Sequence, residues 1–425
     1  MIETLERPVA STQSGRVGAA CRGCGAALHH VFVDLGVSPL CESFRTPEQL
    51  NTMEPFFPLR TYVCEQCFLA QLEEYVAPEI IFSDYAYHSS YSSSWLEHAR
   101  DYVETMIGRL ALDHGSRVIE LGSNDGYLLQ YFVERHVPVL GIDPAHNLAA
   151  LARQRGVPTL EAFFGESVAR DLVAAGEQAD LIVANNVLAQ APNLHDFVEG
   201  VRLLLGRCGT LSVEVPHLLR LILGNQFDTI YHEHFSYFSL LSVERVLRSH
   251  RLVVFDVEEL PTHGGSLRLF VRHESDATRP ISARVIELRR REVAAGMTSL
   301  AFYDAFRDRV HQTKHTLLQC LIELKQNGHV IVGYGAPGKA NTLLNYCGIR
   351  TDLLDYTVDL NPHKQGLFTP GTHIPILHPG AIADTRPSHI FILPWNLRDE
   401  IMRQLEYVRG WGCKFIMAIP TLSVG

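Results

Sequence analysis

One short segment concentrates side chains that move protons near neutral pH. Tyr231, His232, Glu233 and His234 are consecutive, and Tyr237 follows shortly after them. Imidazole, carboxylate and phenol groups are common general acids and bases, so the segment predicts acid–base chemistry. A polar surface turn anchored by its aromatic side chains is the alternative, and the segment alone leaves both interpretations open.

Four of the nine cysteines form two CxxC pairs, Cys21 with Cys24 and Cys64 with Cys67. Two such pairs supply the four thiolates of a tetrahedral Zn²⁺ shell. A closed shell has no open coordination position, so we expect a structural zinc. The 39 residues between Cys24 and Cys64 exceed the spacing of a minimal ribbon and predict an inserted loop. Cys41, between the pairs, is expected not to be a ligand.

A strand, a glycine-rich turn and a helix come before the acid–base segment. The apolar run 117–121 leads into the turn 122–126, whose glycines let the backbone approach a cofactor closely. The next strand ends at Asp143, 17 residues after Gly126, where an acid can accept hydrogen bonds from ribose hydroxyls. Asn124 stands where a GxGxxG dinucleotide site has its middle glycine, so the turn does not match that fingerprint.

The alternation of strands and helices continues through the middle of the chain. The strand 179–184 ends at Asn185, and the strand 209–216 follows a helix. This order predicts a mostly parallel sheet that binds its ligands at the carboxyl edge. The glycine-rich turn, Asp143, Asn185 and the acid–base segment should meet there. Phe163 and Phe164 either flank an adenine at this edge or pack in the core.

The last third of the chain predicts a second, smaller doubly wound unit. Its first strand, 330–334, runs into the turn 335–341, and later strands end at Asp359 and near Asn396. The turn lacks the spacing of a Walker loop, but Lys339 at the helix start could neutralise a diphosphate. A lysine on an exposed turn is the alternative. The amphipathic stretch 283–324 predicts a helical bridge between the two sheets.

Composition narrows the class of protein. The chain has 425 residues, which suggests about three domains. Its formal charge of −10 disfavours a nucleic-acid partner. No run of about 18 apolar residues predicts a membrane span, and residues 1–15 lack the apolar core of a secretion signal. We therefore expect a cytoplasmic enzyme.

Together these motifs resemble one family, the deoxysugar C-methyltransferases of antibiotic biosynthesis. The resemblance covers nearly the whole chain and is most specific in YHEHFSYFS (231–239) and GAPGKANT (335–342). It rests also on the four cysteines, ELGSNDGYLL (120–129), GIDP (141–144), ANNVLAQ (184–190) and VDLNPHKQG (358–366). It implies an S-adenosylmethionine-dependent enzyme that methylates C3 of a dTDP-linked 4-keto-2,6-dideoxyhexose through an enolate.

The resemblance also implies roles for individual residues. His234 matches the base that removes the sugar proton, Glu233 and Tyr231 match residues that support proton transfer, and Tyr85 matches a tyrosine that closes over the sugar. Tyr87 could take that last role instead. We expect the cofactor site to use Glu120, Gly122, Asn124, Asp143, Phe164 and Asn185, and the sugar nucleotide to meet Gln190, Lys339, Asn341 and Asn396.

One residue departs from the family pattern. Relatives often carry histidine where this chain has Gln190, and an amide cannot exchange a proton near pH 7. Methylation at C5, or C-methylation combined with NADPH-dependent 4-keto reduction, are therefore alternatives. Two further classes remain: an oxidoreductase that holds a nicotinamide cofactor at the turn 335–339, and a zinc-organised scaffold with a vestigial donor site.

The expected fold is α/β in three parts. We predict a zinc ribbon over residues 1–82, a class I methyltransferase (Rossmann-like) core with a bridging helix over 83–310, and a smaller Rossmann-like domain over 311–425 that contacts the nucleotide-sugar.

Overall fold

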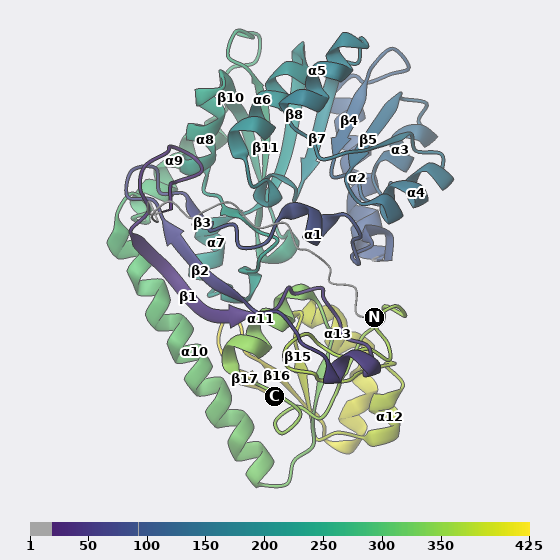
Figure 1. The fold of residues 1–425 in the computed structure, drawn as a ribbon, viewed down its shortest axis with the longest axis vertical. Helices are drawn as coiled ribbons and strands as arrows, with labels where there is room; N and C mark the ends of the chain where they lie inside the picture. Colours follow the sequence, from purple (N-terminus) through teal and green to yellow (C-terminus); the bar gives the residue numbers. More distant parts are fainter. Residues whose placement is uncertain (1–18, 92) are drawn as a thin grey trace, which may run out of the picture.

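The computed structural model describes residues 19–91 and 93–425 (Figure 1). Residues 1–18, on which the absence of a secretion signal was predicted, lie outside this range. Three sheets organise the chain: one of four strands near the N-terminus, one of seven strands in the middle, and one of six strands at the C-terminal end. Within the described residues, no helix is both long enough and apolar enough to cross a bilayer.

The central sheet has the strand order β10-β11-β8-β7-β4-β5-β6. Strands β4 to β8 are parallel, and β11 is antiparallel to both β8 and β10. The chain order reverses between β4 and β7, which is where doubly wound sheets bind their ligands. This topology confirms the predicted class I methyltransferase core. Its strands are β4 (Val118–Leu121), β5 (Val139–Asp143), β6 (Thr159–Glu161), β7 (Ala179–Asn185), β8 (Leu205–Pro216), β10 (Leu252–Leu260) and β11 (Ser266–His273).

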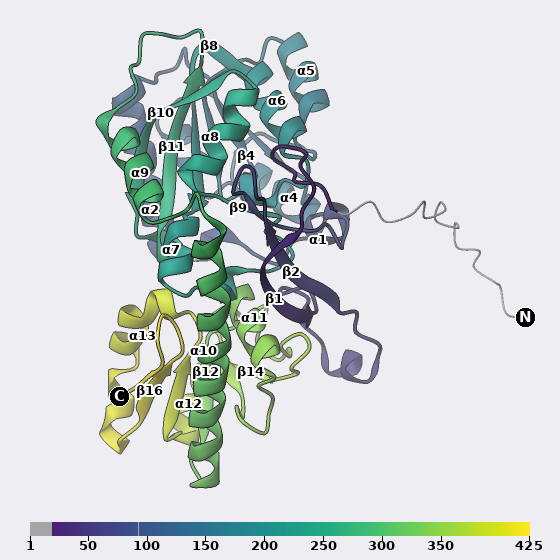
Figure 2. The same ribbon diagram turned by 90° about the vertical axis from the view of Figure 1, so that its left-hand side faces the viewer.

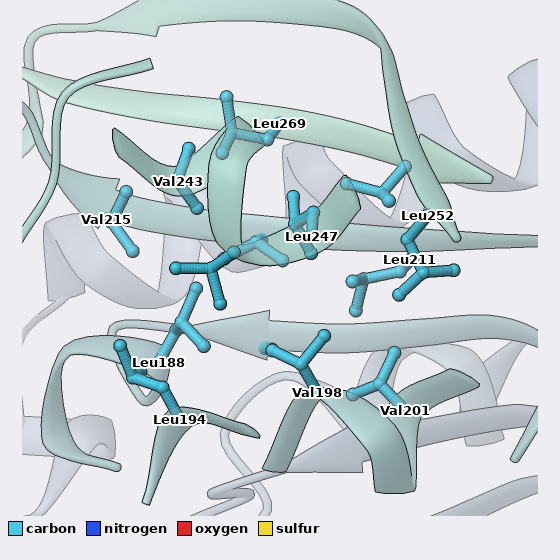
Figure 3. Close-up of a cluster of buried hydrophobic side chains, with 14 of the residues drawn as sticks. Leu188, Leu194, Val198, Val201, Leu211, Val215, Val243, Leu247, Leu252 and Leu269 are labelled. Atoms are coloured by element: carbon cyan, nitrogen blue, oxygen red, sulfur yellow. The ribbon is translucent and has the colours of Figure 1, made fainter. Parts of the chain in front are cut away.

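Helices cover both faces of the central sheet. The apolar side chains of α6 and α8 interleave with those of β8 and β11, including Val198, Val201, Val243 and Leu247 (Figure 3). Burial of these aliphatic side chains is the main stabilising contribution on this face. The helices of this unit are α2 (Ser93–Leu110), α3 (Leu129–Glu134), α4 (His146–Gln154), α5 (Glu166–Ala174), α6 (Leu194–Leu204), α7 (Leu218–Leu223), α8 (Leu240–Ser249) and α9 (Ala283–Ala294).

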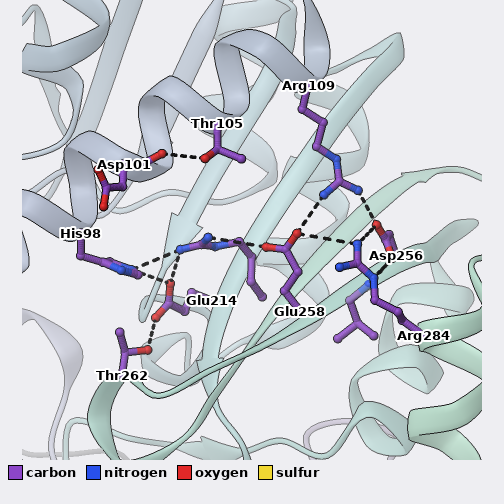
Figure 4. Close-up of polar contacts among 11 residues, drawn as sticks. His98, Asp101, Thr105, Arg109, Glu214, Asp256, Glu258, Thr262 and Arg284 are labelled. Atoms are coloured by element: carbon purple, nitrogen blue, oxygen red, sulfur yellow. Dashed lines mark hydrogen bonds and ion pairs between the residues drawn. The ribbon is translucent and has the colours of Figure 1, made fainter.

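A buried carboxylate ties α2 to the antiparallel end of the sheet. Glu214 on β8 is fully buried and contacts Arg268 at 3.0 Å, the Thr262 hydroxyl at 2.7 Å and His98 at 3.4 Å (Figure 4). Burial alone would raise the pKa of Glu214, but these donors lower it to about 2. The ionised carboxylate therefore fixes His98 of α2 beside the turn that begins at Thr262.

The N-terminal sheet incorporates a strand from the middle of the chain. Its order is β1 (His30–Ser38), β2 (Phe57–Val63), β3 (Ala70–Leu72) and β9 (Ser236–Tyr237). Ala70 pairs with Tyr237 and Gln71 with Ser236. The segment between the cysteine pairs does fold alongside, as β1, a short 3-10 turn (Pro47–Asn51) and β2. The acid–base segment is thereby attached to the cysteine-bearing unit.

The C-terminal sheet has the order β14-β13-β12-β15-β16-β17, in which all strands but β17 are parallel. Its strands are β12 (Ile331–Tyr334), β13 (Thr357–Val358), β14 (Ile376–Leu377), β15 (His389–Ile392), β16 (Lys414–Met417) and β17 (Ser423–Val424), and its helices are α11 (Gly338–Cys347), α12 (Ala381–Thr385) and α13 (Arg398–Gln404). The order around β12 confirms the second doubly wound unit.

The long helix α10 (Leu300–Gln326) joins the two α/β units and lies against β1 and α11 (Figures 1 and 2). The helical bridge is thus two helices, α9 and α10. The predicted boundary at residues 310/311 falls inside α10, so the backbone has no break there. The division into 1–82, 83–310 and 311–425 stays a prediction.

Candidate active site

A cavity of about 1140 Å³ lies where the three units meet. Its walls come from the loop around Cys41, from the carboxyl edge of the central sheet and from the first turn of α11. Among the residues predicted from sequence, the lining includes Tyr85, Gly122, Asn124, Asp143, Phe164, Asn185, Gln190, Tyr231, Glu233, His234, Lys339 and Asn396. The cavity therefore brings together most of the residues that the sequence singled out.

Two predicted residues lie behind the wall rather than in it. Asn341 is fully buried, and its amide donates to the Cys41 carbonyl at 2.6 Å. Glu120 is buried beneath the glycine-rich turn, where burial and the neighbouring Asp143 and Asp125 hold its pKa well above the usual range. Both residues support the lining, and neither side chain faces the cavity.

One end of the cavity lies over the carboxyl ends of β4, β5 and β7. Gly122 has a φ of +66°, and a Cβ there would lie 3.0 Å from Val187. Asp143 accepts from the backbone N–H of Asn124 at 2.7 Å and of Ala145 at 2.9 Å. These bonds fix a buried carboxylate at the tip of β5, where it can accept from a vicinal diol.

Asn185 and the two phenylalanines complete this end. The side-chain oxygens of Asn185 and Asn186 are buried and have no hydrogen-bond partner among the described residues. Phe163 is 41% exposed, and Phe164 packs edge-on against Phe197 at 5.3 Å. Unpaired acceptors beside a glycine turn and a carboxylate fit a ligand with amino and ribose groups, such as S-adenosylmethionine.

The acid–base segment forms a buried loop in the middle of the cavity. The short 3-10 turn at Phe227–Thr229 precedes it, and β9 ends it. The Nδ1 of His234 lies 3.2 Å from the Thr229 carbonyl. A carbonyl only accepts, so Nδ1 carries the proton and Nε2 keeps its lone pair. The ring of Tyr231 lies 4.2 Å from that of His234.

His234 is an uncharged imidazole at neutral pH, with a proton on Nδ1 only. Burial lowers its pKa to about 4, although the bond to the Thr229 carbonyl opposes this shift, and His263 and Lys339 lower it further. His232, by contrast, points away from the cavity and bonds the Pro58 carbonyl at 3.1 Å. The two histidines of the motif therefore differ, since one lines the cavity and the other anchors the loop.

Glu233 is held by two donors from distant segments. The Tyr85 phenol donates to Oε2 at 2.6 Å, and the Cys41 thiol donates to Oε1 at 3.3 Å. Burial and the nearby Glu42 raise the pKa of Glu233 to about 7, and the two donors lower it only in part. This carboxyl can therefore gain or lose a proton near physiological pH. Tyr87 also lines the cavity but has no bond to Glu233.

The opposite wall comes from the C-terminal sheet. The Lys339 ammonium, in the first turn of α11, bonds Asn396 at 2.7 Å and lies 4.8 Å from the Trp395 ring. Asp359, beyond β13, accepts from the Ala336 N–H at 2.7 Å. Burial lowers the pKa of Lys339, and the nearby Asp228 counters this. A helix start with a half-buried lysine suits an anionic group.

Sequence reasoning missed several residues of the lining. Glu42 forms a 3.1 Å ion pair with Lys364. Cys41 was predicted only as a thiol that does not bind the metal, and it lies outside the cysteine cluster, as expected. His263 lines the cavity, has a left-handed φ of 53°, and makes no hydrogen bond with any described residue. Its setting, Thr262-His263-Gly264-Gly265, offered a signal because paired glycines mark unusual backbone.

The four predicted zinc ligands come together. The thiols of Cys21, Cys24, Cys64 and Cys67 all lie within 4.8 Å of one another, with 3.4 Å between Cys21 and Cys67 and 3.5 Å between Cys24 and Cys64. Four sulfurs at such spacing fit the tetrahedral shell of one Zn²⁺. The cluster lies outside the cavity lining, which fits a structural ion.

Known families match the chain along most of its length. A family described as a putative zinc binding domain matches residues 21–82, a methyltransferase domain matches 95–254, and a C-methyltransferase C-terminal domain matches 261–420. The chain is 35% identical over 401 residues to the C-methyltransferase NovU of Streptomyces niveus, which covers 94% of this chain and 95% of NovU.

Solved structures are more distant. Magnesium protoporphyrin IX methyltransferase from Synechocystis covers 42% of this chain and 81% of its own, at 14% identity and a TM-score of 0.32. The 1,6-didemethyltoxoflavin-N1-methyltransferase of Burkholderia thailandensis covers 50% of this chain and 97% of its own, at 16% identity and a TM-score of 0.32. Scores this low carry no argument about the fold or function. The match to NovU and the three matching domains show that the chain belongs to the C-methyltransferase family, as an S-adenosylmethionine-dependent enzyme with a zinc-binding domain.

Proposed function

We propose that this enzyme methylates C3 of a dTDP-linked 4-keto-2,6-dideoxyhexose through an enolate, in the biosynthesis of a deoxysugar. The observation that carries the proposal is the buried loop in which a neutral imidazole, a carboxyl with a pKa of about 7 and a phenol line one cavity. A carbon beside a ketone becomes nucleophilic only when its proton is removed, and this loop holds groups suited to that step.

His234 is the proposed base. Its Nδ1–H is bound to the Thr229 carbonyl, which leaves the Nε2 lone pair to accept the C3 proton. The electrons of the C3–H bond then form a C3–C4 double bond, and the π electrons of the C4 carbonyl move onto the ketone oxygen, so the negative charge is shared between that oxygen and C3. An imidazole with a pKa of about 4 holds a proton weakly, so the enolate oxygen must be stabilised strongly. An anionic substrate beside Lys339 would also raise the basicity of His234.

Tyr231 is the proposed donor to that oxygen. Burial and the nearby Glu233 hold its pKa well above the usual range, so the phenol stays protonated and able to donate. Glu233 accepts a hydrogen bond from the Tyr85 phenol and so orients Tyr85 over the sugar. The Glu233 carboxylate can also store the proton that His234 receives. Gln190 has no side-chain hydrogen bond with any described residue and lines the cavity, so its amide can contact the ketone or a hydroxyl.

The two ends of the cavity suit the two ligands. Asp143 would bind the ribose hydroxyls of S-adenosylmethionine, with Gly122, Asn124, Asn185 and Phe164 around it. When bound, this cofactor supplies the electrophilic methyl group that the enolate carbon takes. Lys339 and Asn396 would bind the diphosphate of the sugar nucleotide, and Asp359 could accept from its ribose. We expect the protein to act in the cytoplasm.

One assay tests the proposal. Purified enzyme is incubated with S-adenosylmethionine and a dTDP-4-keto-2,6-dideoxyhexose, and the products are analysed by mass spectrometry and NMR. A mass gain of one methylene, located at C3 by NMR, supports the proposal. Methylation found at C5 would instead show that the enzyme acts on C5 and not on C3. Titration calorimetry with S-adenosylmethionine and with NADPH is the companion test. Tight NADPH binding with reduction of the ketone would favour the bifunctional or oxidoreductase alternative.

A further inference from the structure

The first zinc turn carries an arginine whose side chain leaves the zinc-binding unit. Arg22 lies between Cys21 and Cys24 and is half-buried. Its Nε donates to the Pro192 carbonyl at 2.8 Å, and its Nη1 donates to the Leu72 carbonyl at 3.0 Å and the Phe235 carbonyl at 2.8 Å. One guanidinium thus binds three backbone segments, a geometry that no lysine could reproduce.

Two of these segments carry proposed site residues. Phe235 directly follows His234, and Pro192 follows Gln190 by two positions. The Phe235 N–H also donates to the Ala189 carbonyl at 2.8 Å, so the two segments are bound to each other as well as to Arg22. The guanidinium lies 5.5 Å from the centre of the Phe235 ring. Arg22 therefore holds together the two segments that carry Gln190 and His234, both of which line the cavity.

The backbone of Arg22 is fixed in turn by the zinc centre. Its N–H donates to Gln71 Oε1 at 2.8 Å, and Gln71 Nε2 donates to the Cys21 sulfur at 3.1 Å. Gln71 sits in β3 and pairs with Ser236 of β9. The metal ligands, Arg22 and the His234 loop are consequently joined by one continuous set of hydrogen bonds, and a bound Zn²⁺ would fix its first member.

We infer that Arg22 is a positioning residue, through which the zinc centre sets the geometry of His234 and Gln190. The inference rests on the proposed roles of those two residues. It assigns the zinc-binding unit a part in catalysis beyond folding, because a rigid metal turn would keep the base at the separation of about 3 to 3.5 Å from its carbon that proton transfer needs. Misplacement by about 1 Å can cost on the order of a hundredfold in rate.

The test compares Arg22→Met with Arg245→Met. Arg245 of α8 is exposed and donates to the Gln66 carbonyl in the second zinc turn, so it supports the metal unit without a hydrogen bond to the segments that carry Gln190 and His234. Arg22→Met should lower kcat about 10- to 100-fold while zinc content and the Kd for S-adenosylmethionine stay at the wild-type values. Arg245→Met should leave kcat within about twofold of wild type.

Hydrogen–deuterium exchange supplies a readout that needs no substrate. Faster amide exchange in peptides spanning 189–193 and 230–237 is expected in Arg22→Met and not in Arg245→Met. Unchanged exchange in both peptides, or equal loss of kcat in the two variants, would overturn the inference. If Arg22→Met does not fold, Arg22→Lys replaces it under the same criteria. Wild-type enzyme that is inactive on every keto sugar would refute the proposed function, and the exchange result would still decide the role of Arg22.

Discussion

The Tyr85 phenol and the Glu233 carboxylate share a 2.6 Å hydrogen bond across 148 residues of sequence. The bond joins the tyrosine-containing segment 83–91, which precedes α2, to the acid–base loop, and both side chains line the cavity. Burial and the neighbouring Glu42 disfavour the ionised form of Glu233. Within the described residues, two hydrogen-bond donors favour the ionised carboxylate, the Tyr85 phenol and the Cys41 thiol. The protonation state of Glu233 is therefore set jointly by both segments.

The pH dependence of kcat/KM should report this carboxyl. His234, with a pKa of about 4, is already unprotonated above pH 5, so it adds no step near neutrality. Glu233 loses its proton near pH 7. If the ionised form orients Tyr85, kcat/KM rises as the pH rises through about 7, and the step is absent in Glu233→Gln. In Tyr85→Phe this step should disappear as well, because no phenol is left to orient, while the pKa of Glu233 itself, followed by NMR of the labelled carboxyl, should move higher because a donor that lowers it is lost.

His234→Asn should abolish methyl transfer. Asparagine is polar and of similar shape but cannot take a proton, and loss of a general base costs about 10² to 10⁴ in rate. The Kd values of both ligands should stay near wild type. Solvent deuterium exchange at C3, measured without methyl donor, isolates the step and should vanish in this variant. Near-normal turnover in His234→Asn together with an inactive Tyr231→Phe would make Tyr231 the base.

Asp143→Ala should weaken S-adenosylmethionine binding by roughly 1.5 to 3 kcal/mol, because it removes charge-assisted hydrogen bonds to the ribose. Titration calorimetry measures the change. Asp171→Ala, an exposed change on α5, is the matched control. Because Asp143 also accepts two backbone N–H groups, the thermal midpoint of each variant is measured alongside. Unaltered donor affinity in a folded Asp143→Ala protein would exclude Asp143 from the cofactor site.

The zinc prediction is tested with two exposed cysteines. Cys24→Ser removes one of the four predicted ligands, whereas Cys208→Ser changes an exposed thiol outside the cluster. Elemental analysis should find one zinc per chain in wild type and Cys208→Ser, and less in Cys24→Ser. Since the metal holds a small unit with little core of its own, Cys24→Ser should lose more than about 2 kcal/mol of unfolding free energy. Wild-type protein purified without chelator and free of zinc would end this claim.

Local patterns in the sequence were enough to predict the strands that end at Gly122, Asp143 and Asn185, because parallel strands are short apolar runs followed by turns. The same holds for the CxxC pairs. The antiparallel strands β10 and β11 were not predicted, since their order in the sheet depends on pairing between segments far apart. The helix α11 begins at Gly338, so Lys339 lies at a helix start, as predicted.

The contacts that define the site were the least predictable. Cys41 bonds a carboxylate 192 residues away, and no spacing rule connects it with Glu233. The pairing of β9 with β3 is of the same kind, because two residues of strand carry no signal of their own. Motifs thus identified which groups do chemistry, whereas the tertiary fold determines which of them, such as Asn341, lie behind the wall.

His263 provides the last prediction. Its backbone is left-handed, its ring lies 5.1 Å from that of Trp95, and the adjacent Gly264 packs so closely on Trp395 that a Cβ there would lie 2.3 Å from the indole. Strain of this kind is kept where a side chain has a task. Burial, with Lys339 nearby, lowers the pKa of His263 to about 4, so it is a neutral hydrogen-bonding group in the cavity.

We expect His263 to contact the sugar nucleotide between His234 and Lys339. His263→Asn retains a residue that tolerates the left-handed backbone, and it should raise the KM of the sugar nucleotide about tenfold, the cost of one buried hydrogen bond. The Kd for S-adenosylmethionine should not change. His136→Asn is the control, since His136 also has a left-handed φ of 57° but is exposed, precedes the start of β5 and does not line the cavity. Equal KM values in the two variants would show that the strained turn serves packing against Trp395 alone.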